Sequence, residues 1–323
     1  MDYWCTDEVE PQARFDHWRE VRAKGLFGVT AELAPEQRAA FSGEFSLRRI
    51  GAVGLVELRA SPYQVERSAA DIADAPGDSI CVYQQLGGGG WFGGTRGEDF
   101  AITNGGFASS HTDLPYRTAP LAGSGFHLRI LKIPLGAIAV EAKRTRDLAP
   151  KPFNDRALAV LLASCFADLG EAMDEPTQAA PLVEALAQFV LIERGVLRPG
   201  SRRGQYALRI GRLSLAQRLI ASELHNSNLS PTVVADRLGV SVRHVHMLFE
   251  MSEKSFSQTV TAQRLTRSRR LLREAPERLI ADVAAACGFE SLATYYRVFH
   301  AAYGMAPGDF RTWAVGAGSA GEH

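Results

Sequence analysis

The first half of the chain shows short apolar or alternating segments of the kind that form β-strands. In such segments successive side chains point to opposite faces, so one face can be buried. The breaks between the segments are rich in glycine and proline, and they include residues 87–94, Pro115, Pro120 and Pro134. Short strands at regular spacing predict an antiparallel barrel or sandwich, preceded by a helix at 14–24. The predicted strand segments are 45–50, 54–60, 79–86, 100–110 and 126–133.

After residue 155 the apolar positions recur with a helical period instead. This pattern predicts helices at 156–173 and 181–197, separated by the helix-breaking stretch 174–178. Both helices are apolar around more than half of their circumference. The hairpin that they form must therefore cover the barrel, a second subunit, or both. The stretch 197–204 is typical of an exposed linker between domains, and everything after it has a helical pattern.

These patterns predict an α+β protein with two domains, at 1–198 and 205–317. A length of 323 residues is enough for two hydrophobic cores. Hydrophobic residues make up 46% of the chain, but no apolar run approaches the roughly 18 residues of a membrane span. Residues 1–10 are acidic and lack the pattern of a secretory signal. We therefore expect a cytoplasmic protein with no membrane partner.

The four cysteines are scattered along the chain. Cys5, Cys81, Cys165 and Cys287 form no C-x-x-C pair, and no histidine lies at zinc-ligand spacing from them. We expect four unrelated thiols, most of them buried, since a free cysteine packs as a small hydrophobic residue. A redox switch is the less favoured alternative. No metal and no other cofactor is expected.

The net charge of zero hides a difference between the two halves. Residues 1–198 carry 20 Lys and Arg against 26 Asp and Glu, a balance of −6. Residues 199–323 carry 16 against 10, a balance of +6. This asymmetry suggests that the back half alone meets a polyanion, although a solvated surface would explain the charge equally well.

A repeat in the back half points to the polyanion. Residues 231–249 and 280–299 match at a fixed offset: Ala235 and Ala284 are 49 residues apart. Gly239 and Gly288 are separated by the same 49 residues. Val234 matches Val283, and Val240 matches Phe289.

The repeat has the residue types that a helix-turn-helix requires. A small residue in the first helix lets the second helix cross closely, and glycine four positions later supplies the positive φ of the tight turn. Ser241, two residues after Gly239, is a good N-cap for the helix that follows. Two copies at one spacing therefore predict two DNA-binding helix-turn-helix units. A helical repeat without nucleic acid is the weaker alternative.

A basic amphipathic segment, residues 255–275, connects the two units. About 19 helical residues at roughly 1.5 Å each would span ~28 Å. This length is close to the ~34 Å between successive major grooves on one face of DNA. Arg267 and Arg270 are candidate phosphate contacts, and an ordinary solvated helix face is the alternative interpretation.

These motifs resemble the DNA-binding domain of the AraC/XylS family of transcription regulators, over about residues 212–312. The resemblance is carried by I-A-D-V-A-A-A-C-G-F at 280–289, R-V-F at 297–299, Y-G-M-A-P at 303–307 and S-V-R-H-V-H-M-L-F at 241–249. It implies an all-α domain with two helix-turn-helix units. The sequence departs from the family at Met247, where a basic residue is usual, and at Ala293 and Thr294.

The resemblance implies recognition helices at about 241–250 and 290–301. Arginine can bind guanine with two hydrogen bonds, while serine or tyrosine more often contacts phosphate. An alternative role for Arg297 is pairing with an internal carboxylate. The candidate DNA-binding residues are Ser241, Arg243, His244, His246, Arg267, Arg270, Glu290, Ser291, Tyr296 and Arg297.

The front half resembles the AraC-binding-like domain that precedes this DNA-binding unit in one branch of the family. The similar features are R-F-D-H-W at 14–18, the segment 41–51 and the glycine-rich centre. This resemblance implies a small cupin-like jelly-roll β-barrel followed by two helices that often mediate dimerisation. The predicted helices 156–173 and 181–197 fit that dimerisation role.

Catalysis is not expected of the front domain. It lacks the His-x-His pair of metal cupins, and the chain has no Gly-x-Ser-x-Gly, P-loop or dinucleotide motif. Residues 87–94 are interpreted as a β-turn or pocket rim. A pocket for a small organic effector is the better hypothesis, and an inward-facing Arg67 or Arg129 would suit an acid. The candidate effector-binding residues are Tyr83, Trp91, Phe92, His111, Tyr116 and Arg129.

The sequence thus predicts a DNA-binding transcription regulator, an activator that responds to a small organic, aromatic or acidic effector. Its expected partners are promoter DNA, the effector, RNA polymerase and a second copy of the chain bound through the helical hairpin. The alternative is an effector-independent DNA-binding or protein-interaction module.

Overall fold

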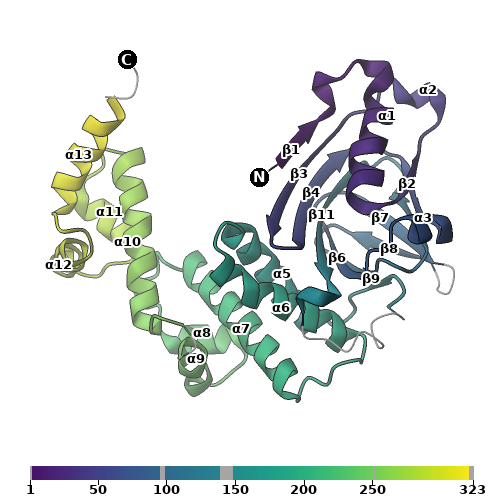
Figure 1. The fold of residues 1–323 in the computed structure, drawn as a ribbon. Helices are drawn as coiled ribbons and strands as arrows, with labels where there is room; N and C mark the ends of the chain where they lie inside the picture. The colour runs from purple at the N-terminus through teal and green to yellow at the C-terminus, as the bar shows by residue number, and fades with distance from the viewer. Residues whose placement is uncertain (1, 95–98, 139–147, 251, 320–323) are drawn as a thin grey trace. The chain divides into compact units, whose positions relative to one another are not determined.

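The structure, a computed structural model, describes residues 2–94, 99–138, 148–250 and 252–319. The chain forms two compact units, Met1–Gly211 and Arg212–His323. They meet within helix α7 (Arg202–Ser222), so this helix begins inside the segment 197–204 that was predicted as a linker. The front unit is rich in β-strands and the back unit is helical (Figure 1), which confirms the predicted α+β fold of two domains.

Two antiparallel sheets make up the front unit (Figure 1). The seven-stranded sheet has the order β1 (Asp2–Cys5), β3 (Gly43–Ile50), β4 (Val53–Ala60), β11 (Phe126–Pro134), β6 (Ser79–Gln85), β9 (Phe107–His111) and β12 (Lys151–Pro152). The five-stranded sheet has the order β2 (Thr30–Glu32), β5 (Gln64–Arg67), β10 (Tyr116–Pro120), β7 (Gly89–Gly94) and β8 (Phe100–Thr103). Short helices α2 (Pro35–Arg38) and α3 (Ala69–Asp74) connect strands. The predicted strands at 45–50, 54–60, 79–86 and 126–133 are confirmed.

Two details of the predicted strand pattern are corrected. Residues 87–94, interpreted as a turn or pocket rim, contain strand β7, which pairs with β10 on one side and β8 on the other. The turn interpretation is therefore wrong, whereas Gly90 and Phe92 of this segment do line a cavity between the sheets. Glycine is unfavourable in strands, but here neighbours occupy the space of side chains: a Cβ on Gly93 would lie 2.5 Å from Asp99 Oδ1. The segment 100–110 is two strands, β8 and β9, which belong to different sheets.

The core of the front unit lies between the sheets and under the N-terminal helix. Helix α1 (Arg14–Trp18) continues directly into a π-helix, Arg19–Phe27, where the sequence predicts one helix at 14–24. Phe15 packs edge-on against Phe41 with ring centroids 5.2 Å apart. Such aromatic pairs bury large apolar areas in a defined geometry. The helix therefore closes one end of the space between the sheets.

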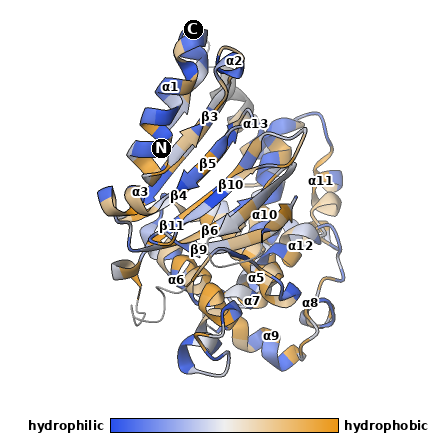
Figure 2. Ribbon diagram, turned by 90° about the vertical axis from the view of Figure 1, so that its right-hand side faces the viewer, coloured by the Kyte–Doolittle hydropathy of each residue, from blue (hydrophilic) through white to orange (hydrophobic). Residues whose placement is uncertain are grey.

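The helical hairpin packs against the front unit's own sheet. Helix α5 (Arg156–Ala172) contacts β9 through Phe166 and Phe107, with ring centroids 5.8 Å apart. Arg194, which follows α6 (Pro176–Glu193), donates a hydrogen bond of 2.7 Å to the carbonyl of Ser109 in β9. Figure 2 shows how much of α6 is hydrophobic, and most of its apolar residues are buried within this chain. The hairpin therefore covers the barrel, whereas Val160 of α5 is 49% exposed.

The back unit contains two small cores joined by one helix, α10 (Phe256–Glu274). The start of α10 contributes Phe256 and Val260 to the first core, and its second half contributes Leu265 and Leu272 to the second. The first core also holds α8 (Pro231–Leu238) and α9 (Val242–Phe249). The second holds α11 (Ile280–Ala286), α12 (Leu292–Tyr303) and α13 (Pro307–Ser319).

Three general expectations can be compared with the structure. Within the described ranges none of the four cysteines forms a disulfide, and three of them, Cys81, Cys165 and Cys287, are buried. No helix among the described residues is long and apolar enough to cross a membrane. Within the same described ranges, no group of three or more His, Cys, Asp or Glu side chains could hold a metal ion.

Candidate nucleic-acid interface and ligand cavity

The first helix-turn-helix unit consists of α8 and α9. Ser230 caps α8, and the turn after α8 is made by Gly239 with φ of +64°. Ser241 then caps α9 by accepting a hydrogen bond of 3.2 Å from the backbone N–H of His244, which confirms the predicted N-cap. Ala235 is 1% exposed, because α9 crosses α8 closely at this small residue.

The second unit, α11 and α12, has the same plan. Ala284 is 3% exposed at the helix crossing, and Gly288 makes the turn with φ of +78°. Ser291 caps α12, and its Oγ accepts a hydrogen bond of 3.4 Å from the backbone N–H of Thr294. The 49-residue repeat in the sequence is therefore a structural repeat of two helix-turn-helix units.

The second turn is one residue longer than the first, which the fixed sequence offset does not reveal. The capping residues Ser241 and Ser291 are 50 residues apart, since Glu290 is an additional residue in the second turn. Alignment on the caps pairs the buried Val245 with the buried Tyr295. This alignment, and not the offset of 49, places equivalent side chains on the same face of the two recognition helices.

The exposed faces of the recognition helices carry most of the candidate residues. Arg243 and His246 are exposed on α9, and His244 is half-buried. On and before α12, Tyr296, Arg297 and Glu290 are exposed. Among the described residues no ion pair joins Arg297 to a carboxylate, so the alternative of an internal pair finds no support here. Ser241 and Ser291 are exposed but also hold the helix N-termini.

The arginines of α10 have different surroundings. Arg270 is exposed and pairs with Glu274 of the same helix at 3.6 Å. Arg267 is half-buried, and its Nε is buried without a hydrogen-bond partner among the described residues. Arg269 stacks over the rings of Tyr303 and Phe310, 4.8 and 5.3 Å from their centroids. Arg270 is thus open to solvent, whereas Arg269 stabilises the second core.

Arg264 has a structural role that the sequence analysis did not detect. Its Nη2 donates a hydrogen bond of 2.7 Å to the carbonyl of Asn226, and its Nε donates one of 3.2 Å to the carbonyl of Leu224. The same guanidinium lies 5.8 Å from the ring centroid of Phe289, in the second turn. Burial lowers the pKa of Arg264. Arg264 therefore connects the end of α7, beside the first helix-turn-helix unit, to the turn of the second helix-turn-helix unit.

A small cavity lies between the two sheets of the front unit. Its open volume is about 30 Å³, enough for one or two water molecules. Three predicted effector residues, Tyr83, Phe92 and Tyr116, line this cavity together with Arg22. Burial raises the pKa of Tyr116 to about 12 and that of Tyr83 well above its ordinary value, so both hydroxyls stay neutral donors.

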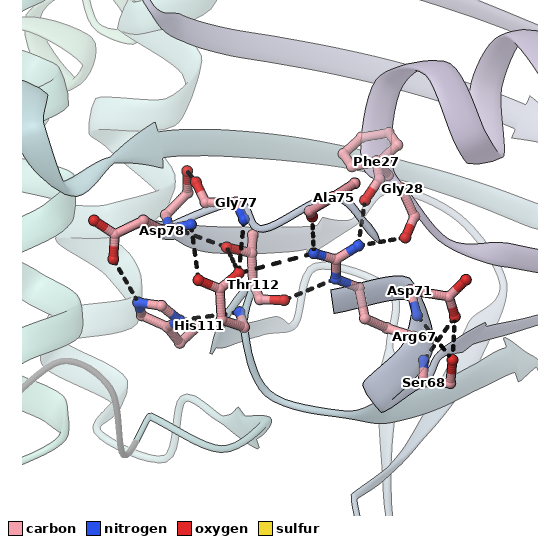
Figure 3. Close-up of polar contacts among 12 residues, drawn as sticks. Phe27, Gly28, Arg67, Ser68, Asp71, Ala75, Gly77, Asp78, His111 and Thr112 are labelled. Carbon is pink, nitrogen blue, oxygen red and sulfur yellow. Dashed lines mark hydrogen bonds and ion pairs between the residues drawn. The ribbon is translucent and has the colours of Figure 1, made fainter. Parts of the chain in front are cut away.

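The other three predicted effector residues lie outside this cavity. Trp91 is adjacent to Phe92 in β7, so its side chain points to the opposite face of the sheet. Arg129 pairs with Glu57 of the neighbouring strand β4, with Nη2 and Oε2 2.8 Å apart. His111 is buried in a network of turns (Figure 3), where its Nδ1 accepts a hydrogen bond of 3.0 Å from the backbone N–H of Asp113.

Arg67, considered as a partner for an acid, is part of the same network (Figure 3). Its guanidinium donates to the carbonyls of Thr112 at 2.8 Å and Ala75 at 2.7 Å, and also to that of Gly28. The carboxylate of Asp113 lies 3.8 Å away. These contacts satisfy the buried cation, so Arg67 holds loops together and does not face the cavity.

Two helix-turn-helix units, each with a capped second helix and an exposed polar face on it, are the arrangement of a DNA-binding protein. Comparisons with known proteins support both halves. The family profile described as helix-turn-helix domain matches residues 234–312, and the one described as AraC-binding-like domain matches residues 18–193, more than half of the chain. The chain belongs to the AraC/XylS family of transcription regulators and is not an enzyme.

Several proteins that are similar to this chain are named transcriptional activators. The transcriptional activator NphR of Rhodococcus sp is 25% identical over 296 residues, which cover 88% of this chain and 85% of that protein. The transcriptional activator RhrA of Rhizobium meliloti (strain 1021) is 29% identical over 107 residues, 33% of this chain and 34% of that protein. The crystal structure of the AraC-like transcriptional activator CuxR has a TM-score of 0.51 at 21% identity, over 88% of this chain and 99% of that one. The last likeness supports the fold.

Proposed function

We propose that this protein activates transcription in the cytoplasm when a small organic effector binds in its front domain. The observation that carries the proposal is the pair of helix-turn-helix units, each with an exposed polar face on its second helix. The AraC-binding-like domain with its internal cavity supports the effector half of the proposal. Relatives named as transcriptional activators support activation over repression.

The proposed base contacts come from the exposed faces of α9 and α12. Arg243 and Arg297 can each offer two parallel N–H donors to guanine, and His246 and Tyr296 lie on the same faces. The remaining candidates fit contacts to the DNA backbone or helix capping. They are Ser241, His244, Arg267, Arg270, Glu290 and Ser291.

The length of α10 suits the binding of two grooves on one DNA face. Its 19 residues give a rod of about 28 Å. The two small cores lie at its two ends, so α9 and α12 are held apart by most of this length (Figure 1). Successive major grooves on one face are about 34 Å apart, and each unit can therefore reach its own groove.

The signal from effector to promoter would be a shift in the population of conformations. The cavity is smaller than an organic effector, so binding must move the side chains that line it. We propose that this movement changes how a homodimer presents its DNA-binding units to the promoter and RNA polymerase. The outer face of α5, where Val160 is exposed, is the part of the predicted dimerisation hairpin that remains available.

The experiment that tests DNA recognition is a mobility-shift titration of the full chain. The chain's own upstream region is compared with scrambled DNA at several salt concentrations. We expect tighter binding to the upstream region, and affinity that falls steeply as salt rises because phosphate contacts release counterions. Arg243→Ala should weaken specific binding by about 1–3 kcal/mol. Arg117→Ala, at an exposed position of β10, is the matched control and should leave binding unchanged.

Three results would contradict parts of the proposal. The same affinity for the upstream region in Arg243→Ala as in the original chain would remove Arg243 from the base contacts. Absence of DNA binding at low salt would favour the alternative of a protein-interaction module. Sequence-selective binding that no small molecule alters, in a thermal-shift screen of acids, amines and sugars, would favour effector-independent regulation.

A further inference from the structure

Arg22 is a buried cation whose surroundings do not satisfy it. It lies in the π-helix Arg19–Phe27 and is 4% exposed. Its Nε and Nη1 are buried and have no hydrogen-bond partner within the described ranges of the chain. Its Cζ instead lies over two aromatic rings, those of Phe27 and Tyr63, at 5.1 and 5.7 Å from their centroids.

Arg67, a second buried arginine of the same domain, shows how a buried guanidinium is normally satisfied. Arg67 is 2% exposed, but backbone carbonyls and the carboxylate of Asp113 satisfy its guanidinium. Contact with aromatic faces stabilises a cation only in part. Burying a charge without a hydrogen-bonded partner is costly, so buried charges in proteins are normally paired. Among the residues that the structure describes, no anion therefore pairs with Arg22.

Arg22 also lines the cavity between the sheets. The other lining side chains are mostly apolar or aromatic, and they include Phe27, Phe92, Phe126 and Ile130. The polar exceptions on the wall include the Tyr83 and Tyr116 hydroxyls, which burial keeps neutral. A ligand in this space would therefore meet one cation in an otherwise uncharged, apolar environment.

We propose that Arg22 anchors the effector, and that the effector is a small carboxylate with an apolar body. A guanidinium donates charge-assisted hydrogen bonds to a carboxylate, and the Nε and Nη1 of Arg22, which lack a partner among the described residues, are two donors that such a ligand could use. The aromatic and aliphatic walls bury the rest of the molecule. The proposal rests on the effector-responsive function given above and identifies the chemical class and the anchoring residue. Arg129, which the sequence also suggested for an acid, is outside the cavity and paired with Glu57.

The first test uses the full chain and pairs of compounds that differ in charge alone. Phenylacetate and hexanoate are compared with phenylacetamide and hexanamide, and with phenethylamine, by thermal shift and calorimetric titration. We expect the acids to raise the melting temperature by several degrees, whereas the amides and the amine do not. An equal shift by the amides would overturn the carboxylate proposal but leave effector sensing in place. A shift by none of the acids would also overturn it.

The second test uses variants of Arg22. In Arg22→Met, which keeps the length and loses the charge, the affinity for the acid should fall at least about tenfold, the cost of a charge-assisted hydrogen bond. Arg22→Lys should recover part of the loss, because lysine offers charge without the planar fork. Arg129→Met is the matched control and should bind the acid as the original chain does.

The stability of the ligand-free variant separates anchoring from a purely structural role. Because Nε and Nη1 of Arg22 are buried without a hydrogen-bond partner in the described part of the chain, Arg22→Met should melt at the same temperature as the original chain or higher in the absence of ligand. Marked destabilisation with unchanged acid affinity in Arg22→Lys would show that Arg22 serves the fold, and would overturn the proposal. Mobility-shift assays on these variants without ligand then report on DNA binding independently.

Discussion

The two helix-turn-helix units share a plan but differ at the turn and on the exposed face. A Cβ on Gly239 would meet no atom within 4 Å, so its positive φ is the sole requirement for glycine there. A Cβ on Gly288 would lie 2.2 Å from the carbonyl oxygen of Leu224 and 2.9 Å from Arg264 Nη2. The turn at Gly239 is therefore open, whereas the turn at Gly288 packs against Leu224 at the end of α7 and against Arg264. The same residue type satisfies different physical requirements in the two copies.

The exposed faces differ as well. Aligned on their caps, the two helices pair Arg243 with Ala293, and Met247 with Arg297. The arginine lies in the first turn of α9 but in the second turn of α12. Two copies of one structural plan can therefore present their cations to different base pairs, which is how one chain can recognise an asymmetric site.

The largest expected effect is at the packed turn. Gly288→Ala adds a Cβ against backbone at a positive φ, and should cost about 3 kcal/mol or more from strain and overpacking together. Gly239→Ala should cost about 1–2 kcal/mol from the backbone conformation alone. Hydrogen exchange of the full chain, followed separately over α8–α9 and α11–α12, measures both. Equal effects at the two glycines would contradict the difference between the turns.

A second expected effect is the loss of the connection between the units. Arg264→Ala removes two hydrogen bonds from a cation to backbone carbonyls and should cost about 2–3 kcal/mol. Protection from hydrogen exchange should fall at the end of α7 and in the turn at Phe289 together. Arg270→Ala is the matched control on the same helix, because an exposed pair with Glu274 contributes about 0.5 kcal/mol or less. Loss confined to one of the two regions would show that Arg264 does not couple them.

A third prediction concerns the position of the cation on the exposed face of α9. The double variant Arg243→Ala/Met247→Arg gives α9 the cation placement of α12 without changing the net charge. Affinity for the specific site should fall by about 1–3 kcal/mol, while affinity for scrambled DNA should be unchanged because the phosphate attraction is the same. Mobility-shift titrations on both DNAs measure the affinity for the specific site and the affinity for scrambled DNA. Unaltered specific affinity would mean that the place of the cation along α9 is unimportant for recognition.

The smallest expected effects are at the starts of the first helices. Ser230 caps α8, whereas Leu279 precedes α11 without a side-chain cap and is 68% exposed. Ser230→Ala should therefore destabilise its unit by about 1 kcal/mol, and Leu279→Ser should stabilise the other by about 0.5–1 kcal/mol. Hydrogen exchange at α8 and α11 measures both changes. Destabilisation by Leu279→Ser would indicate that Leu279 contributes packing that its exposure does not suggest.

Much of the candidate interface was predictable because its signals are local. The spacing of Ala235 to Gly239 and of Ala284 to Gly288 lies within one helix and one turn, where short-range geometry dominates. The extra residue Glu290 was missed because the repeat was aligned on glycine, and the cap is what sets the phase of the following helix. Strand β7 was missed for the opposite reason, since its glycines are accommodated by neighbours distant in sequence.

The sequence by itself determined the β-rich front and helical back of the chain, the two helix-turn-helix units, the family and the division into an acidic front half and a basic back half. These properties follow from periodicity, turn chemistry and composition, which act between residues close in the chain. Only the tertiary structure decided that carbonyls satisfy Arg67 and that Arg264 joins the two helix-turn-helix units. It alone also shows that Arg22 lines a cavity, where its Nε and Nη1 have no hydrogen-bond partner among the described residues. All three are arginines, one in the π-helix Arg19–Phe27, one in β5 and one in α10. Their roles differ because a buried cation is defined by the groups that long-range packing brings within hydrogen-bond distance.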